Sequence, residues 1–157
     1  MDNLATNSIL MKYLFLFLSV FAFAQQIKSV DFKTVNGRIN INTKDKSVSG
    51  DVIYTFEVLK PIDTIKIDAQ NMTFTEVELK GKNISFSTNG KELLLIHPFQ
   101  KGKNSVQFSY EAKPKQTMYF VGSEETDNLE IWTQGQGKYT SHWFPSFDKK
   151  KKKVIFN

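Results

Sequence analysis

The sequence feature that most constrains the fold is an alternation of apolar and polar residues that recurs from Ile27 to Lys113. In the segment 48–58, for example, Val52, Tyr54, Phe56 and Val58 all fall on one side of an extended chain. Side chains alternate across a strand, so this spacing places one face of each strand in a core. The 3.6-residue period of an amphipathic helix is nowhere sustained. The chain therefore predicts strand after strand.

Turn residues separate these strands. Asn36-Gly37 predicts a turn between the first two strands, and Asn89-Gly90 predicts a later hairpin, because Asn-Gly is a strong two-residue turn signal. The polar segment 43–46 and Lys60-Pro61 mark further breaks. We expect strands over residues 30–35, 38–42, 48–58, 64–68, 74–79, 84–86, 93–96, 106–110 and 129–133. Short strands at roughly even spacing predict an all-β fold, either an antiparallel β-sandwich or a saddle-shaped sheet.

Composition limits the classes of function. A chain of 157 residues suits one domain, and 40 % apolar residues with 14 Phe suffice for a core. The absence of cysteine excludes disulfides and thiolate metal sites. The net charge of +5 equals the five lysines of the run Lys149–Lys153, so the remaining sequence is balanced. We therefore expect no nucleic-acid partner, although a basic surface built on this run stays the third interpretation.

Residues 1–24 are predicted to be a secretory signal peptide. A lysine after Met11 and a short apolar run precede Ala-Phe-Ala at 22–24, the small-x-small pattern of a cleavage site. Met11 is the expected true start, because residues 1–10 are polar. The apolar run is shorter than the ~20 residues of a spanning helix, which predicts no permanent membrane span. We expect a mature domain over 25–157 that is secreted, periplasmic or extracellular; an uncleaved membrane anchor is the alternative.

The most distinctive stretch of the sequence runs from Trp132 to Asp148. Gln134 and Gln136 stand two apart at the end of an apolar strand, so both project from the same face. Paired amides can donate and accept hydrogen bonds together, and the adjacent Gly135 and Gly137 leave room for a ligand or a second backbone. The pair predicts a binding site, or else merely caps a sheet edge.

Thr133-Gln134-Gly135-Gln136, followed by Phe144-Pro145-Ser146-Phe147-Asp148, resembles a motif of the aminopeptidase N family of zinc aminopeptidases, the gluzincins that include leukotriene hydrolase. In that family a Thr-Gln-x-Gln/Glu strand end and a Phe-Pro-x-Phe/Trp-Asp segment stand at the same spacing. The resemblance implies an N-terminal β domain whose Gln134 and Gln136 reach the active-site cleft. There they would hold the free amino terminus of peptide substrates. Thr140-Ser141 replaces the family's Ala-Arg, and Ser146 replaces its Cys.

The chemistry of that family requires residues that this sequence lacks. The family holds zinc with His-Glu-x-x-His and a distant Glu, and also carries Gly-x-Met-Glu-Asn. Here His97 and His142 each lack a histidine partner four residues on, so both are predicted to be structural. We expect no cofactor in this chain, which would not be catalytic by itself. Zinc and hydrolysis would belong to a catalytic domain, its expected partner.

The end of the chain and the aromatic residues suggest two further expectations. Residues 154–157 look like the start of another strand, which predicts a C-terminally incomplete domain. The alternative function is a standalone secreted β-sandwich binding module. Its surface would be an exposed aromatic platform made of Tyr139, Trp143 and Phe147.

Overall fold

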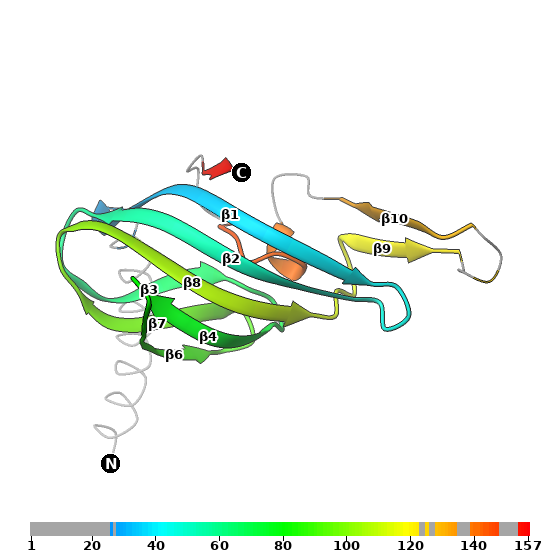
Figure 1. Ribbon diagram of the computed structural model, residues 1–157, viewed down its shortest axis with the longest axis horizontal. Helices are drawn as coiled ribbons and strands as arrows, with labels where there is room; N and C mark the ends of the chain where they lie inside the picture. The colour runs from blue at the N-terminus through cyan, green and yellow to red at the C-terminus, as the bar shows by residue number, and fades with distance from the viewer. Residues whose placement is uncertain (1–25, 27, 123–124, 126–127, 135–138, 148–153) are drawn as a thin grey trace, which may run out of the picture.

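The computed structural model describes residues 26, 28–122, 125, 128–134, 139–147 and 154–157, which form an all-β fold (Figure 1). The predicted signal peptide, 1–24, lies outside the described residues. The strands are β1 (Val30–Asn42), β2 (Ser47–Val58), β3 (Ile62–Asp68), β4 (Thr73–Leu79), β5 (Lys82–Asn83), β6 (Ser85–Thr88), β7 (Glu92–Phe99), β8 (Gly102–Ala112), β9 (Met118–Val121), β10 (Glu130–Thr133) and β11 (Ile155–Phe156). A 3₁₀ helix, η2, spans Thr140–His142. In the described part of the chain, no helix has the length and apolar character needed to cross a membrane.

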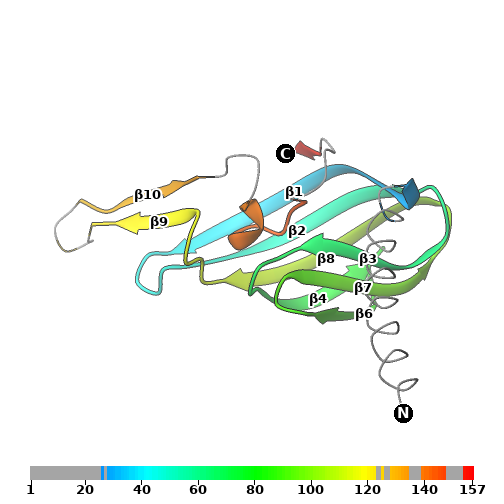
Figure 2. The ribbon, with the colours of Figure 1, turned by 180° about the vertical axis from the view of Figure 1, so that it is seen from behind.

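Two sheets form the body of the molecule. The larger has the order β11-β1-β2-β8-β4-β5, and the smaller has the order β3-β7-β6. They lie face to face, as the views from the two opposite sides show (Figures 1 and 2). All described pairs are antiparallel except β11 with β1, which is parallel. The predicted antiparallel sandwich is thus confirmed, and the predicted strand at 154–157 is present as the two-residue β11.

The core lies between these sheets. Val52, Tyr54, Phe56 and Val58 of β2 are each at most 2 % exposed, which confirms the buried face predicted from their spacing. Ile65 and Leu95, from β3 and β7, close the core from the other side and are fully buried. Removing such side chains from water supplies roughly 1.5–3 kcal/mol each, the main driving force for this fold.

The predicted turn at Asn36-Gly37 is wrong. β1 runs straight through it, and Gly37 is paired with Val52 in the middle of the β1–β2 ladder. The chain reverses later, where the Asp45 backbone N–H donates to the Asn42 side chain over 3.0 Å. A Cβ at position 37 would lie 3.2 Å from Cε2 of Phe144. The absence of a side chain at Gly37 therefore lets an aromatic ring approach the strand closely, which is a known role of glycine in strands.

The second Asn-Gly pair does form its predicted hairpin. Asn89 and Gly90 connect β6 to β7, and Gly90 has a φ of 78°, in the left-handed region that favours glycine. The side-chain oxygen of Asn89 accepts hydrogen bonds from the backbone N–H groups of Lys91 and Glu92 over 2.9 and 2.8 Å. The sequence was enough to predict this turn because the hydrogen bonds to the Asn89 side chain are local.

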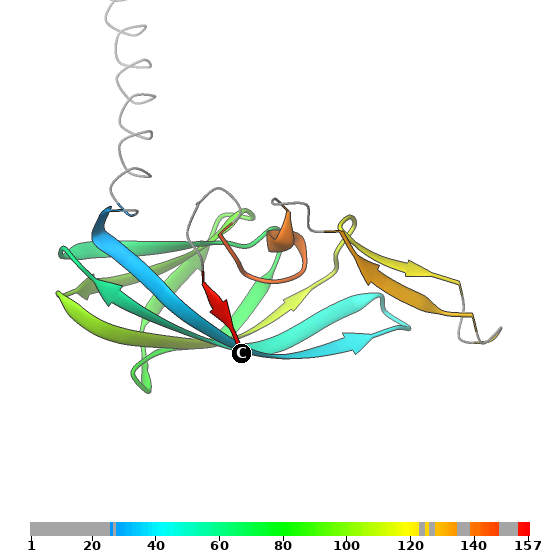
Figure 3. The same cartoon turned by 90° about the horizontal axis from the view of Figure 1, so that it is seen from above.

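A separate two-stranded sheet, β9–β10, projects beyond one end of the sandwich (Figure 3). Tyr119 and Trp132 stack across it with ring centroids 4.3 Å apart. Trp132 remains 46 % exposed, Val121 is 50 % exposed and Ile131 is 36 % exposed. This projecting hairpin therefore carries apolar surface that the described residues leave open.

Candidate functional site

Gln134 stands at the root of the projecting hairpin. It directly follows β10, its side chain is exposed, and its backbone N–H donates to the carbonyl oxygen of Thr117 over 2.8 Å. The Thr117 hydroxyl donates to the carbonyl oxygen of Tyr139 over 3.1 Å. Thr117 thus holds the backbone on both sides of residues 135–138. Gln136 lies outside the described residues, so its place relative to Gln134 stays a prediction.

The segment 139–147 is held by backbone hydrogen bonds to the end of β3. It begins at Tyr139, which has a φ of 79°, and turns through η2. Asp68 and Ser146 then exchange two backbone hydrogen bonds of 2.9 Å each, and the N–H of Gln70 donates to the Ser141 carbonyl over 2.7 Å. These contacts join residues more than 70 positions apart in the chain. They fix the aromatic motif to the sandwich.

Two buried tyrosines of the large sheet hold the 139–147 segment by hydrogen bonds. The Tyr54 hydroxyl donates to the Pro145 carbonyl over 2.6 Å, and the Tyr110 hydroxyl donates to the Trp143 carbonyl over 3.0 Å. Burial raises the pKa of both phenols well above their usual value, and the neighbouring Tyr110 adds a smaller effect at Tyr54. Both groups therefore remain hydrogen-bond donors at neutral pH. This role was not predicted from the sequence, although a tyrosine hydroxyl on the apolar face of β2 needs a hydrogen-bond partner.

We expect Tyr54→Phe to lower the free energy of unfolding at pH 7 by about 1–3 kcal/mol, because the Pro145 carbonyl loses a buried donor. The unfolded chain ionises tyrosine near pH 10, whereas burial keeps Tyr54 protonated in the folded chain. Its contribution is therefore present below about pH 10 and is lost as the pH rises above it. Urea unfolding at neutral pH and at roughly pH 11 should show a shallower alkaline loss in the variant. Tyr119→Phe, on the projecting hairpin, is the control; equal effects of the two changes would contradict the assignment.

Three aromatic side chains of the segment, Trp143, Phe144 and Phe147, pack in or against the core. Phe144 is 2 % exposed, and Phe147 lies with its ring centroid 4.3 Å from that of Phe32. Trp143 is also partly buried against the core. Of the three residues expected to form an exposed platform, only Tyr139 is open, at 54 %. The predicted aromatic platform is therefore wrong, because Trp143 and Phe147 gain more by burial against the sheet than by facing water.

The two histidines lie in different surroundings. The His97 ring packs edge-on against Phe99, with centroids 5.2 Å apart, and the His142 ring lies edge-on to Tyr139 at 5.9 Å. The Gln116 side-chain nitrogen also lies within 3.4 Å of both ring nitrogens of His142. No three His, Asp or Glu side chains of the described residues gather closely enough to hold a metal ion. The donor set that zinc requires is thus not found in the described part of this chain.

Comparison with known proteins places this arrangement in one family. Residues 33–157 match the family described as the peptidase M1 N-terminal domain. Over 126 residues the chain is 28 % identical to aminopeptidase N of Lactobacillus helveticus, an alignment that covers 76 % of this chain and 15 % of that protein.

Solved structures share the fold. Leukotriene A4 hydrolase from Saccharomyces cerevisiae superposes with a TM-score of 0.71 at 16 % identity, covering 83 % of this chain and 23 % of that one. A mutant M1 zinc metallopeptidase from Deinococcus radiodurans, bound to a Tyr-Ser-Ala substrate, superposes with a TM-score of 0.68 at 12 % identity. That match covers 82 % of this chain and 32 % of the other.

The chain spans between 15 % and 32 % of the length of these three relatives. The family match covers most of the chain and includes both parts of the aromatic motif at 133–148. The implied all-β N-terminal fold and the observed sheets agree. The chain belongs to the M1 peptidase family, as an N-terminal domain of that family.

Proposed function

We propose that this domain shapes the cleft of a zinc aminopeptidase and anchors the free amino terminus of peptide substrates through Gln134 and Gln136. Hydrolysis is the work of a catalytic domain, the partner of this chain, which also holds the zinc ion. The domain itself is not catalytic. It acts outside the cytoplasm, exported by the signal peptide predicted at residues 1–24.

The observation that carries this proposal is the position of Gln134. Its amide is exposed at the end of a short strand whose backbone is fixed by Thr117, so the side chain is free to meet a ligand while its base is rigid. A neutral amide oxygen accepts hydrogen bonds from an ammonium group without competing for zinc as a carboxylate would. The apolar surface of Val121, Ile131 and Trp132 beside it suits burial against a second domain.

The energetic scale is that of a hydrogen bond to a charged group, about 1.5–3 kcal/mol. In an enzyme that carries this chain as its N-terminal domain, we expect Gln134→Ala and Gln136→Ala each to lower kcat/KM for free-amino peptides. The expected loss is roughly tenfold to hundredfold, mainly as a raised KM. Steady-state kinetics on an aminoacyl anilide measures it.

Gln107→Ala is the matched control. Gln107 is an exposed glutamine of β8, in the body of the sandwich. Gln107→Ala removes the same side-chain amide, and kcat/KM for free-amino peptides should remain unchanged. Unaltered kcat/KM in both hairpin variants, with the fold intact by circular dichroism, would show that the amides do not anchor the substrate.

A further inference from the structure

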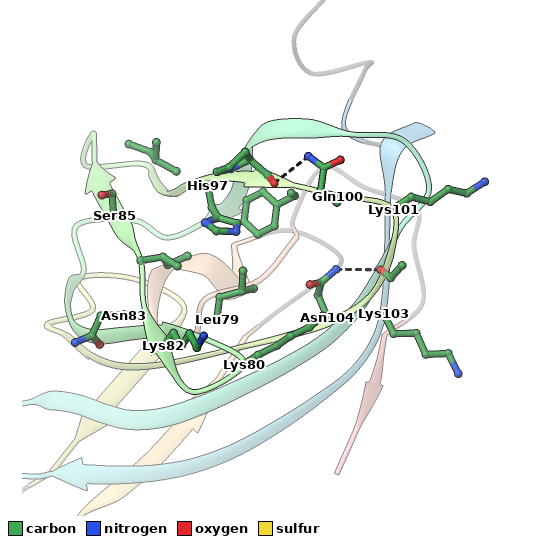
Figure 4. Close-up of a pocket in the computed structure, with 15 residues that line it drawn as sticks. Leu79, Lys80, Lys82, Asn83, Ser85, His97, Gln100, Lys101, Lys103 and Asn104 are labelled. Carbon is green, nitrogen blue, oxygen red and sulfur yellow. Dashed lines mark hydrogen bonds between the residues drawn. The ribbon is translucent and has the colours of Figure 1, made fainter.

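A cleft of about 900 Å³ is lined by residues of the stretches 79–85 and 96–104 (Figure 4). Figure 1 shows the β7–β8 turn, part of this lining, at the end of the sandwich opposite the projecting hairpin. The pairing of β6 with β7 extends only as far as Ser85 and Ile96. The cleft forms because the residues of β7 after Ile96 have no β6 residue beside them. One wall is the stretch 79–85, which crosses from the large sheet to the small one. The other wall is the β7–β8 turn and its flanks, 96–104. Its size is that of a small-molecule site.

The floor of the cleft is apolar and continuous with the core. Phe99 is 1 % exposed and packs against Phe56, with ring centroids 6.1 Å apart, while Leu79 is 8 % exposed. Ile84 is partly buried beside them. Figure 4 shows the His97 ring directed into the same space. A ligand reaching this floor would bury apolar atoms.

The rim of the cleft is positively charged. Lys80 and Lys82 lie on one wall, Lys101 and Lys103 lie on the other, and no carboxylate is among the lining residues. The ion pairs found among the described residues, Lys33–Asp31 and Lys66–Glu92, do not involve these four lysines. Glu57 is the acidic residue in register with Lys103 in the β2–β8 ladder.

Polar groups at the rim add hydrogen-bonding capacity. The side-chain nitrogens of Gln100 and Asn104 donate to backbone carbonyls of their own turn, over 3.2 and 3.0 Å, which holds both amides in place. In Figure 4, Lys101 and Lys103 extend from this turn away from the cleft. Lysine stems are flexible, and a role in the cleft requires their ammonium groups to turn back toward its mouth. Unpaired ammonium groups around a concave apolar surface concentrate the field that attracts an anion.

We propose that this cleft binds a small organic anion, with a carboxylate or phosphate head at the lysine rim and an apolar body against Leu79, Ile84 and Phe99. The lysine ammonium groups attract the charged head group and donate hydrogen bonds to its oxygen atoms. The apolar body supplies selectivity over inorganic ions. This site is separate from Gln134, which lies at the root of the projecting hairpin.

Calorimetric titration of the full chain with octanoate and octyl phosphate, below their micelle concentrations, tests the proposal. We expect saturable binding of one molecule per chain. Octanamide, which keeps the tail and lacks the charge, and inorganic phosphate, which lacks the tail, should each bind at least about tenfold more weakly. Equal affinity for octanoate and octanamide, or for octyl phosphate and inorganic phosphate, would overturn the proposal, as would the absence of saturation.

Variants locate the site. Lys82→Ala with Lys101→Ala removes one charge from each wall and should weaken octyl phosphate binding about tenfold. Lys44→Ala with Lys46→Ala removes the same charge from the β1–β2 turn and should leave the affinity unchanged. Equal weakening in both pairs would indicate a general charge effect and reject the cleft. Lys101→Gln alone serves if the first pair folds poorly, with a smaller loss expected.

Discussion

Phe144→Ala is expected to lower the free energy of unfolding of this domain by about 3–5 kcal/mol, the cost typical of removing a buried phenylalanine. Phe144 is 2 % exposed. Its ring lies over Gly37 of β1, edge-on to Tyr110 at 6.0 Å, and next to Phe156 at 5.8 Å. The side chain therefore joins the 139–147 segment to three strands of the large sheet, β1, β8 and β11. Alanine would leave a cavity between them.

Urea unfolding followed by circular dichroism measures this loss. Phe86→Ala is the control, since Phe86 is 38 % exposed on β6 and its removal should cost about 1 kcal/mol or less. We expect a lower midpoint for the Phe144 variant with an unchanged slope. If the two variants unfold at the same urea concentration, Phe144 does not fasten the segment to the sheet.

Gly50→Ala is expected to be destabilising by about 3 kcal/mol or more, although alanine normally gains over glycine inside a strand. Gly50 lies in β2 between Ile39 of β1 and Tyr110 of β8. A Cβ there would lie 2.5 Å from the carbonyl oxygen of Arg38 and 2.9 Å from Cε1 of Tyr110. The oxygen belongs to the backbone of the neighbouring strand, so relief requires the central strands to separate.

Gly37→Ala provides the matched comparison. The new methyl group would meet the far edge of the Phe144 ring at 3.2 Å rather than a backbone atom, and a ring edge can shift by a few tenths of an ångström. We expect this variant to lose at least about 1 kcal/mol less than Gly50→Ala. Thermal unfolding of the two variants side by side measures the difference. Equal losses would mean that the close approach of Arg38 to Gly50 does not limit the packing.

The candidate site could be located from sequence only in part. Gln134 was identified from its spacing at a strand end, a local property. The residues that hold its surroundings, Thr117, Tyr54 and Tyr110, could not be identified, because each acts on backbone more than 20 positions away. Residues brought together over such distances leave no periodic signal in the chain. The partial burial of Trp143 and Phe147 was not predicted for the same reason.

The sequence by itself determined the class of structure and the inward face of its strands. Alternation in β2 and the local Asn89-Gly90 turn follow from side-chain geometry and short-range hydrogen bonds, so no distant contact was needed to predict them. The role of Gly37 was decided only by the tertiary structure. The Asn36-Gly37 pair could form a turn, but it lies in a continuous strand, where the absence of a side chain leaves room for the Phe144 ring. The tertiary structure also decided the parallel pairing of β11 with β1 and the cleft between the sheets. These features depend on which strands become neighbours, and the long-range burial of apolar surface selects that arrangement over the local turn preference.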